Sequence, residues 1–199
     1  MYSLNSTNTI RDRKYYHLWI NSTHKKSFFI TNLDKAFFIS MLQNNLSPHK
    51  KLGDTSVTKH SYSDDIDLLA YSLTETGVHL LINASKESVV DKFAHDLLVG
   101  YLKYFLNEHK KQDSPFNSIF IYEQLKDAHD ALHASKDIHL MHQDWRHDRY
   151  SSIGFYLDDR RGDWIKLHHL SGLYDFSAKR YLDFLQKEDI LSEPQVVVV

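Results

Sequence analysis

Histidine is the residue type in this chain with the widest chemical repertoire. The sequence holds 14 histidines and no cysteine, which excludes disulfide bonds, thiolate zinc sites and cysteine nucleophiles. Five of the histidines form two groups, His139 with His142 and His147, and His168 with His169. None has the His-Glu-x-x-His spacing typical of zinc hydrolases. We therefore interpret these five residues as surface histidines. His79 lies in an apolar run, and we interpret it as a strand residue held by one hydrogen bond.

Basic and aromatic residues in predicted loops are the candidates for contact with nucleic acid. The basic candidates are Lys25, Lys26, Lys50, Lys51, Lys110, Lys111, Arg146, Arg149, Arg160 and Arg161. Each of them is also compatible with an ordinary solvated surface. Trp145, Tyr150 and Tyr156 are candidates for stacking on unpaired bases, although the apolar run around Tyr156 favours packing instead. The net charge of -2 argues mildly against tight binding to a polyanion.

Four segments in the first half of the chain have clear periodicity. Residues 15–21 alternate in polarity and are rich in aromatic and β-branched residues, which predicts a strand. Residues 31–46 carry apolar residues at spacings of three and four after a capping Thr31 or Asn32, which predicts an amphipathic helix. Residues 66–73 and 78–83 are apolar runs joined by a short turn-like segment, which predicts a hairpin. The polar, aperiodic stretch 47–63 between them predicts a surface loop.

The second half continues the alternation of helices and strands. A helical pattern starts at Ser88, residues 118–122 have the composition of a strand, and residues 126–141 are helical. The order is βαββαβα, so the expected fold class is α+β, a ferredoxin-like antiparallel sheet covered by helices. We expect this domain to span residues 1–143. Residues 144–199, with a helix at 176–187, are expected to form a small helical appendage packed on it as one structural unit.

Motifs in a fixed order carry a family resemblance. Tyr16-His17 opens the first strand, residues 69–73 and 77–82 form the expected hairpin, residues 136–140 read Lys-Asp-Ile-His-Leu, and residues 145–157 hold a Trp and a Tyr-Ser-Ser triplet. In this order the chain resembles the REP-associated tyrosine transposases, a bacterial family of HUH-type single-strand transposases. The resemblance covers nearly the whole chain. It implies DNA as the partner and DNA transposition as the ancestral activity.

The resemblance also implies which residues are missing. In the family, two histidines separated by one hydrophobic residue on a strand hold Mg or Mn. A tyrosine from the later helix attacks the phosphate, and a residue one turn further on completes the metal site. The corresponding positions here are Gly77, His79, Asp137 and Met141. One imidazole does not hold such an ion, and aspartate cannot form a phosphotyrosine. We therefore expect a pseudoenzyme with no intact catalytic residue, no bound metal and no cofactor.

A rebuilt metal site is the sharper alternative at these positions. His79, Asp137, His139 and His142 would supply it if the helix at 126–141 lies over the hairpin. His139 weakens this idea, since a residue two positions from Asp137 on a helix points elsewhere. Residual metal-dependent hydrolysis at His79 and Asp137 would be the corresponding activity.

The leading expectation for function is a DNA-binding protein that recognises a structured single strand, such as a hairpin, through residues near Lys25 and the region from Trp145 to Arg161. The alternative is a protein-interaction or regulatory module without nucleic-acid binding, which the near-neutral charge suits. The polar N-terminus and the short apolar runs predict a cytoplasmic protein without a membrane segment. The resemblance further implies a possible homodimer.

Overall fold

A four-stranded antiparallel sheet forms the centre of the molecule. The computed structural model describes residues 13–22, 27–47, 61–110, 119–171 and 177–187. The strands are β1 (Lys14–Asn21), β2 (Ile66–Leu73), β3 (Gly77–Ala84) and β4 (Ile119–Gln124), and the sheet order is β2-β3-β1-β4. All three neighbouring pairs are antiparallel. The predicted mixed α/β class with an antiparallel sheet and several helices is confirmed.

One face of the sheet holds the main core beneath two helices, α1 (Asn32–Leu46) and α2 (Glu87–Glu108). Alternate residues of β1, which are Tyr16, Leu18 and Ile20, are buried in this core. The first turn of α1 is fixed by a capping box, in which Thr31 accepts from the Asp34 N–H and the Asp34 carboxylate accepts from the Thr31 N–H. The predicted helix at 31–46 is therefore confirmed together with its cap. Its predicted amphipathic pattern is wrong, because Leu33 is exposed whereas Asp34 and Asn45 are buried.

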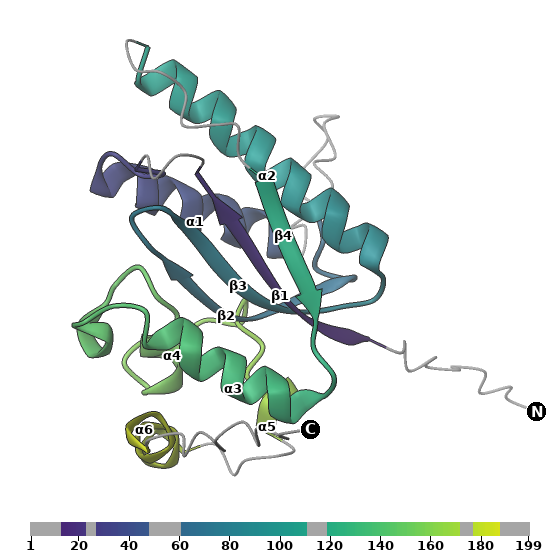
Figure 1. Cartoon of the computed structure of the whole chain (residues 1–199), viewed down its shortest axis with the longest axis vertical. Coiled ribbons are helices and arrows are strands. Elements are labelled where there is room, and N and C mark those ends of the chain that lie inside the picture. Colours follow the sequence, from purple (N-terminus) through teal and green to yellow (C-terminus); the bar gives the residue numbers. More distant parts are fainter. Residues whose placement is uncertain (1–12, 23–26, 48–60, 111–118, 172–176, 188–199) are drawn as a thin grey trace, which may run out of the picture.

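The opposite face of the sheet lies against α3 (Ala128–His139), which contacts β1, β2 and β3. Because side chains alternate along a strand, His17 and Trp19 of β1 point to this α3 face. The register places His79 of β3 directly opposite Trp19, and Glu123 of β4 opposite His17. Figure 1 shows α3 on the other side of the sheet from α1 and α2.

The C-terminal part closes one edge of the sheet. It contains the 3-10 helix η2 (Trp145–His147) and the helices α4 (Ile153–Tyr156), α5 (His168–Ser171) and α6 (Ala178–Gln186). Three backbone hydrogen bonds join it to the outer edge of β2: the Leu73 N–H donates to Tyr150, the Ser152 N–H to Tyr71, and the Lys166 N–H to Leu68. The edge strand therefore has no row of open backbone groups along this stretch.

Most of the predicted elements are confirmed, with shifted ends. The helix predicted at 126–141 is shorter, because Asp127 caps α3 and Leu140 ends it. The helix predicted at 176–187 is α6, whereas η2, α4 and α5 were not predicted. The predicted surface loop at 47–63 is wrong at its end, since Tyr62 is buried and its hydroxyl donates to Asp96. Residues 48–60 and 196–199 lie outside the described residues.

Within the described ranges, no helix combines the length and the apolar character needed to cross a membrane.

Candidate functional site

Two histidines from neighbouring strands meet on the α3 face. The Nε2 atom of His17 on β1 lies 3.2 Å from the Nδ1 atom of His79 on β3. Both side chains are half-buried, and their ring centroids are 5.4 Å apart. Sequence reasoning singled out His79 and missed its partner. The alternation of residues 15–21 was the available signal, because it places His17 on one side of its strand, but only the strand register brings it to His79.

Two carboxylates lie near this histidine pair, His17 and His79. The Glu123 Oε1 atom on β4 is 3.9 Å from His17 Nδ1. Asp137 is exposed on α3 and lies close enough for its charge to act on His17. His79 on β3 thus contacts His17, and Asp137 on α3 acts on the same His17 through its charge.

Burial keeps the histidine pair neutral at neutral pH. It lowers the pKa of His79 to about 4, with a smaller contribution from His17. Burial also lowers the pKa of His17, and the charges of Glu123 and Asp137 oppose this shift. The Nδ1 of His17 faces Glu123, so we assign its proton there, and Nε2 then accepts from the Nδ1–H of His79.

Gly77 occupies a position with no room for a side chain. A Cβ there would lie 2.3 Å from the Ile20 carbonyl oxygen and 2.4 Å from Asn21 Oδ1. The first of these is a backbone atom of the neighbouring strand β1, so it cannot turn away as a flexible side chain would. A histidine at 77 would therefore require β1 to shift. For this reason the two-histidine arrangement on one strand does not fit this backbone.

The other residues of the suggested rebuilt site point elsewhere. His139 is buried, with Nδ1 2.7 Å from the Tyr181 hydroxyl and Nε2 2.7 Å from Ser152 Oγ. His142 Nε2 lies 3.2 Å from the Leu73 carbonyl oxygen. Met141, the position that completes the metal site in the family, is half-buried. It packs on the C-terminal apolar cluster, which we define as the buried apolar residues that α3 shares with residues 153–185 and with β2 and β3.

The Mg or Mn ion that the resemblance implies would be held by two histidines of one strand and by a residue one turn after position 137. These positions do not fit the ion, because residue 77 has no side chain and Met141 offers a thioether, and the second imidazole comes from β1.

A separate open pocket lies between the start of α1 and the loop after α3. Its volume is about 390 Å³. It is lined by Asn32, His142, Gln143, Asp144, His147, Asp148, Arg149 and Tyr150. Among the described residues, the buried Oδ2 atom of Asp148 has no hydrogen-bond partner, and His142 Nε2 lies 3.5 Å from it. The His142 ring therefore faces this oxygen at ion-pair distance.

The predicted DNA-contacting residues differ in their surroundings. Arg146, Arg149 and Arg161 are exposed, and Trp145 is half-buried against the C-terminal apolar cluster. Arg160 instead donates to the carbonyl oxygens of residues 148, 149 and 151, so it holds the loop together.

Two further predictions concern the aromatic candidates and the lysines. Tyr156 is buried, and its hydroxyl donates to the Leu69 carbonyl oxygen at 2.9 Å, which confirms packing as its role. Tyr150 is half-buried on the wall of the pocket, with the ammonium of Lys35 5.0 Å above its ring. Lys25, Lys26, Lys50, Lys51 and Lys111 lie outside the described residues.

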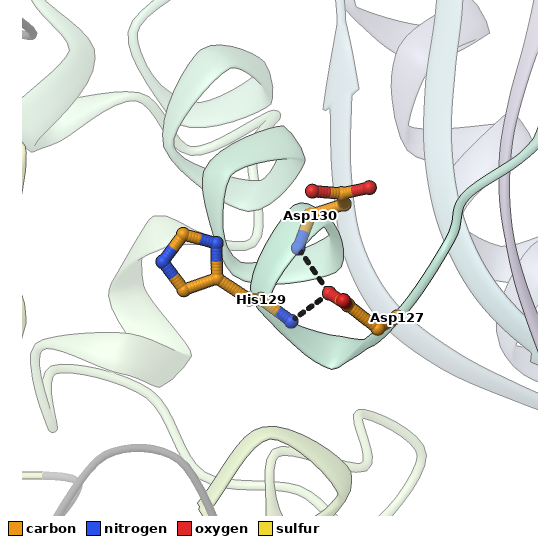
Figure 2. Close-up of side chains that lie close together, drawn as sticks. All are labelled: Asp127, His129 and Asp130. Carbon is orange, nitrogen blue, oxygen red and sulfur yellow. Dashed lines mark hydrogen bonds between the residues drawn. The ribbon is translucent and has the colours of Figure 1, made fainter.

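One exposed group has the spacing of metal ligands. In the part of the chain that the structure describes, Asp127, His129 and Asp130 are such a group, with ligand atoms within 4.8 Å of one another. Figure 2 shows that the Asp127 carboxylate accepts from the N–H groups of His129 and Asp130, at 2.9 and 3.1 Å. The capping of α3 explains this arrangement without a metal.

Comparisons of the chain with protein-family models, with curated proteins and with solved structures gave no match.

Proposed function

We propose that this protein is a transposase-like DNA-binding protein, similar to the REP-associated tyrosine transposases, that binds structured single-stranded DNA without cutting it. The proposed fold is ferredoxin-like with a C-terminal helical appendage. Its support is the chain order βαββαβα, together with a sheet in which β1 and β3 are the central strands. Helices α1 and α2 share one face of that sheet, as the assignment requires.

The proposed loss of cleavage rests on the residues at positions 77, 137 and 141. Position 137 on α3 holds an aspartate, whose carboxylate cannot form a phosphotyrosine with a DNA strand. Position 77 has no space for a metal-binding side chain, and the Met141 thioether is a poor ligand for a hard divalent ion. A protein with this set of residues can hold a strand but has no tyrosine on α3 with which to open it.

The observation that carries the binding proposal is the open pocket of about 390 Å³, whose lining combines Asp148, Arg149 and Tyr150. The exocyclic amines of cytosine and adenine are donors of the kind that a carboxylate reads. Tyr150 supplies an aromatic wall, and Arg149 on the lining supplies a cation for a neighbouring phosphate. An unpaired base in a hairpin loop offers an amine donor, an aromatic ring and a neighbouring phosphate, which match these three groups of the pocket.

A protein-interaction module is the second candidate, and the charge distribution favours it. The loops that carry the exposed arginines also carry Asp144, Asp148, Asp158, Asp159 and Asp163. An apolar patch on α1 and just before it contains Leu33, which is 74% exposed, and Ile30 and Phe37, which are partly exposed. Such a patch is typical of a protein-binding surface.

The two candidates are separated by fluorescence anisotropy with a labelled DNA hairpin and a scrambled single strand, titrated with salt. DNA binding predicts tighter binding to the hairpin and an affinity that falls with salt. Arg149→Ala should weaken binding and reduce the salt slope by about 1. Lys103→Ala, at an exposed position on α2, is the matched control.

Equal or absent binding of both oligonucleotides would overturn the proposal and leave the interaction module. A homodimer, which the resemblance implies, stays a prediction that light scattering of the same sample checks.

A further inference from the structure

We propose that the free edge of β4 binds an extended segment of a partner protein, in which two consecutive basic residues precede an aliphatic one. The bound segment would add a strand to the sheet. The inference goes beyond DNA binding, because it concerns another surface and a protein as the partner. Two features of β4 carry it: the backbone groups along its outer side and the acidic side chains on both of its faces.

The strand β4 pairs with β1 on one side and stands at the end of the sheet (Figure 1). The Leu125 N–H donates to the Tyr15 carbonyl oxygen, and hydrogen-bonded pairs alternate along an antiparallel ladder. The N–H and C=O groups of Phe120, Tyr122 and Gln124 therefore point away from β1. Within the described residues, no backbone hydrogen bond reaches these groups. Such a row of groups is what an extended peptide pairs with when it adds to a sheet.

The two edges of the sheet differ in their protection. The edge at β2 receives backbone hydrogen bonds from residues 150–166. Between residues 119 and 124, β4 has neither proline nor lysine, and its register with β1 runs without a bulge. Edge strands are commonly protected by these features, so β4 is the edge that can accept a strand. Its one charged residue, Glu123, then helps to select the partner.

Glu123 makes the α3 face of this edge acidic. Its side chain is 59% exposed, and His17 Nδ1 lies 3.9 Å from its Oε1 atom. Burial lowers the pKa of His17 and outweighs the opposing charges of Glu123 and Asp137, so the imidazole does not balance the carboxylate at neutral pH. Ile121, two residues earlier on the same face, is half exposed and offers an apolar contact.

Two carboxylates of α2, Glu87 and Asp91, make the other face of the edge acidic. The Tyr122 hydroxyl donates to Glu87 Oε1 at 3.1 Å. The pKa of Tyr122 is raised by burial and then by hydrogen bonding to Asp91 and Glu87, so both carboxylates lie at the same hydroxyl. Both residues are exposed. A hydroxyl donates a hydrogen bond but carries no charge, so it leaves both carboxylates with their negative charge.

The alternation of side chains along a strand turns these positions into a sequence pattern. An antiparallel partner would place one residue beside Glu123, the next opposite Tyr122 and within reach of Glu87, and the next beside Ile121. The matching order is basic, basic, aliphatic. DNA phosphates would be repelled here, and a second copy of β4 would bring the same carboxylates together. The charges therefore favour a basic peptide over both of these occupants.

The test is an anisotropy titration of the full chain with a fluorescein-labelled peptide, Thr-Thr-Lys-Arg-Val-Thr-Thr. The control peptide Thr-Thr-Lys-Val-Arg-Thr-Thr has the same composition and charge, but its basic residues lie on one face of a strand. It should bind about threefold more weakly, because one charge pair is lost. N-methylation of the arginine removes the N–H that would point to β4 and should weaken binding about tenfold. N-methylation of the valine, whose N–H would point away, should leave the affinity unchanged.

Substitutions in the protein test the two acidic faces separately. Glu123→Gln and Glu87→Gln should each weaken binding of the peptide about threefold at low salt, because each removes one exposed charge pair. Asp183→Asn is the matched control. Asp183 is an exposed acidic residue on α6, in the C-terminal part that closes the opposite edge.

Equal affinity for the two peptide orders, equal affinity for the two N-methylated peptides, or no binding of any peptide would overturn the proposal. Hydrogen exchange of the unmutated protein gives a measurement that does not depend on variants. The peptide should protect the amides of residues 120, 122 and 124 from exchange. Protection of these amides without peptide, growing with protein concentration, would show a second copy at the edge and would also overturn the proposal.

Discussion

Acid should destabilise the protein through His139, and the size of the effect follows from its burial. Burial, with a smaller contribution from Arg160, lowers the pKa of His139 to about 3 from an ordinary value of 6.5. Between these two values the unfolded chain binds a proton that the folded chain does not. The contribution of His139 to stability is therefore fully present above about pH 6.5 and falls as the pH decreases toward the folded value.

The loss of stability that His139 causes at pH 5 depends almost entirely on the pKa of its side chain in the unfolded state. Each pH unit below the unfolded pKa costs about 1.4 kcal/mol, so the loss between pH 8 and pH 5 is about 2 kcal/mol. A folded pKa anywhere below about 4 gives the same figure. His17 and His79 contribute in the same direction, since burial lowers the pKa of each. A comparison with a variant at position 139 isolates the part of the pH-dependent loss of stability that is due to His139.

The assay is urea unfolding of the parent protein and of His139→Gln at pH 8 and pH 5. Glutamine keeps hydrogen-bonding capacity toward Tyr181 and Ser152 but takes up no proton. The variant should be less stable than the parent at pH 8 and should lose about 2 kcal/mol less on going to pH 5. His95→Gln, at an exposed position on α2, is the control for replacing a histidine. Identical pH dependence in parent and His139→Gln, or the same change in the control, would refute the reasoning.

Two further substitutions test the packing around the site and the cap of α1. Gly77→Ala should destabilise the fold by about 3 kcal/mol or more, because its Cβ would lie 2.3 Å from the Ile20 carbonyl oxygen, and an unchanged melting temperature contradicts this. Asp34→Asn should lower the free energy of unfolding by about 2 kcal/mol, measured by urea unfolding at neutral pH. The buried Asp34 carboxylate accepts hydrogen bonds from the N–H groups of residues 30 and 31 and from the Tyr104 hydroxyl, and His109 lies within hydrogen-bond distance. Burial opposes ionisation of Asp34, but the hydrogen bonds outweigh it and hold the pKa of Asp34 below its usual value. The stability that Asp34 contributes is therefore present above about pH 3.8 and is lost as the pH falls through the pKa of the folded protein. An Asp34→Asn variant that loses as much stability in acid as the parent would contradict this prediction.

The fold was largely predictable from the sequence because its signals are local. Alternation along residues 15–21 and the apolar spacing along 31–46 depend on neighbouring residues, and both elements occur where expected. The ends of α3 were less predictable. Asp127 can cap a helix only if the chain before it is extended, and that depends on how β4 ends. Short helices such as α4 have too few residues to show a helical spacing of apolar residues in the sequence, so they could not be predicted.

The candidate site was only half predictable, because its second histidine comes from another strand. The packing of α3 against the strand that carries His79 was expected from the order of motifs, whereas the contact of His79 with His17 depends on the register between β1 and β3. The same limit applies to Arg160. Its sequence context is that of an exposed basic pair, but its guanidinium serves three backbone carbonyls that only the folded loop brings together.

The hydrogen bonds that residues 150–166 make to β2 have a consequence for self-association. An added strand needs an open row of N–H and C=O groups, and the C-terminal part occupies that row along β2. Within the described residues, the end of the sheet at β4 has one strand neighbour, β1. Growth by edge pairing at β4 would stop after two copies, because each molecule brings a single docking edge. We therefore expect the C-terminal part to prevent edge-to-edge association beyond a dimer.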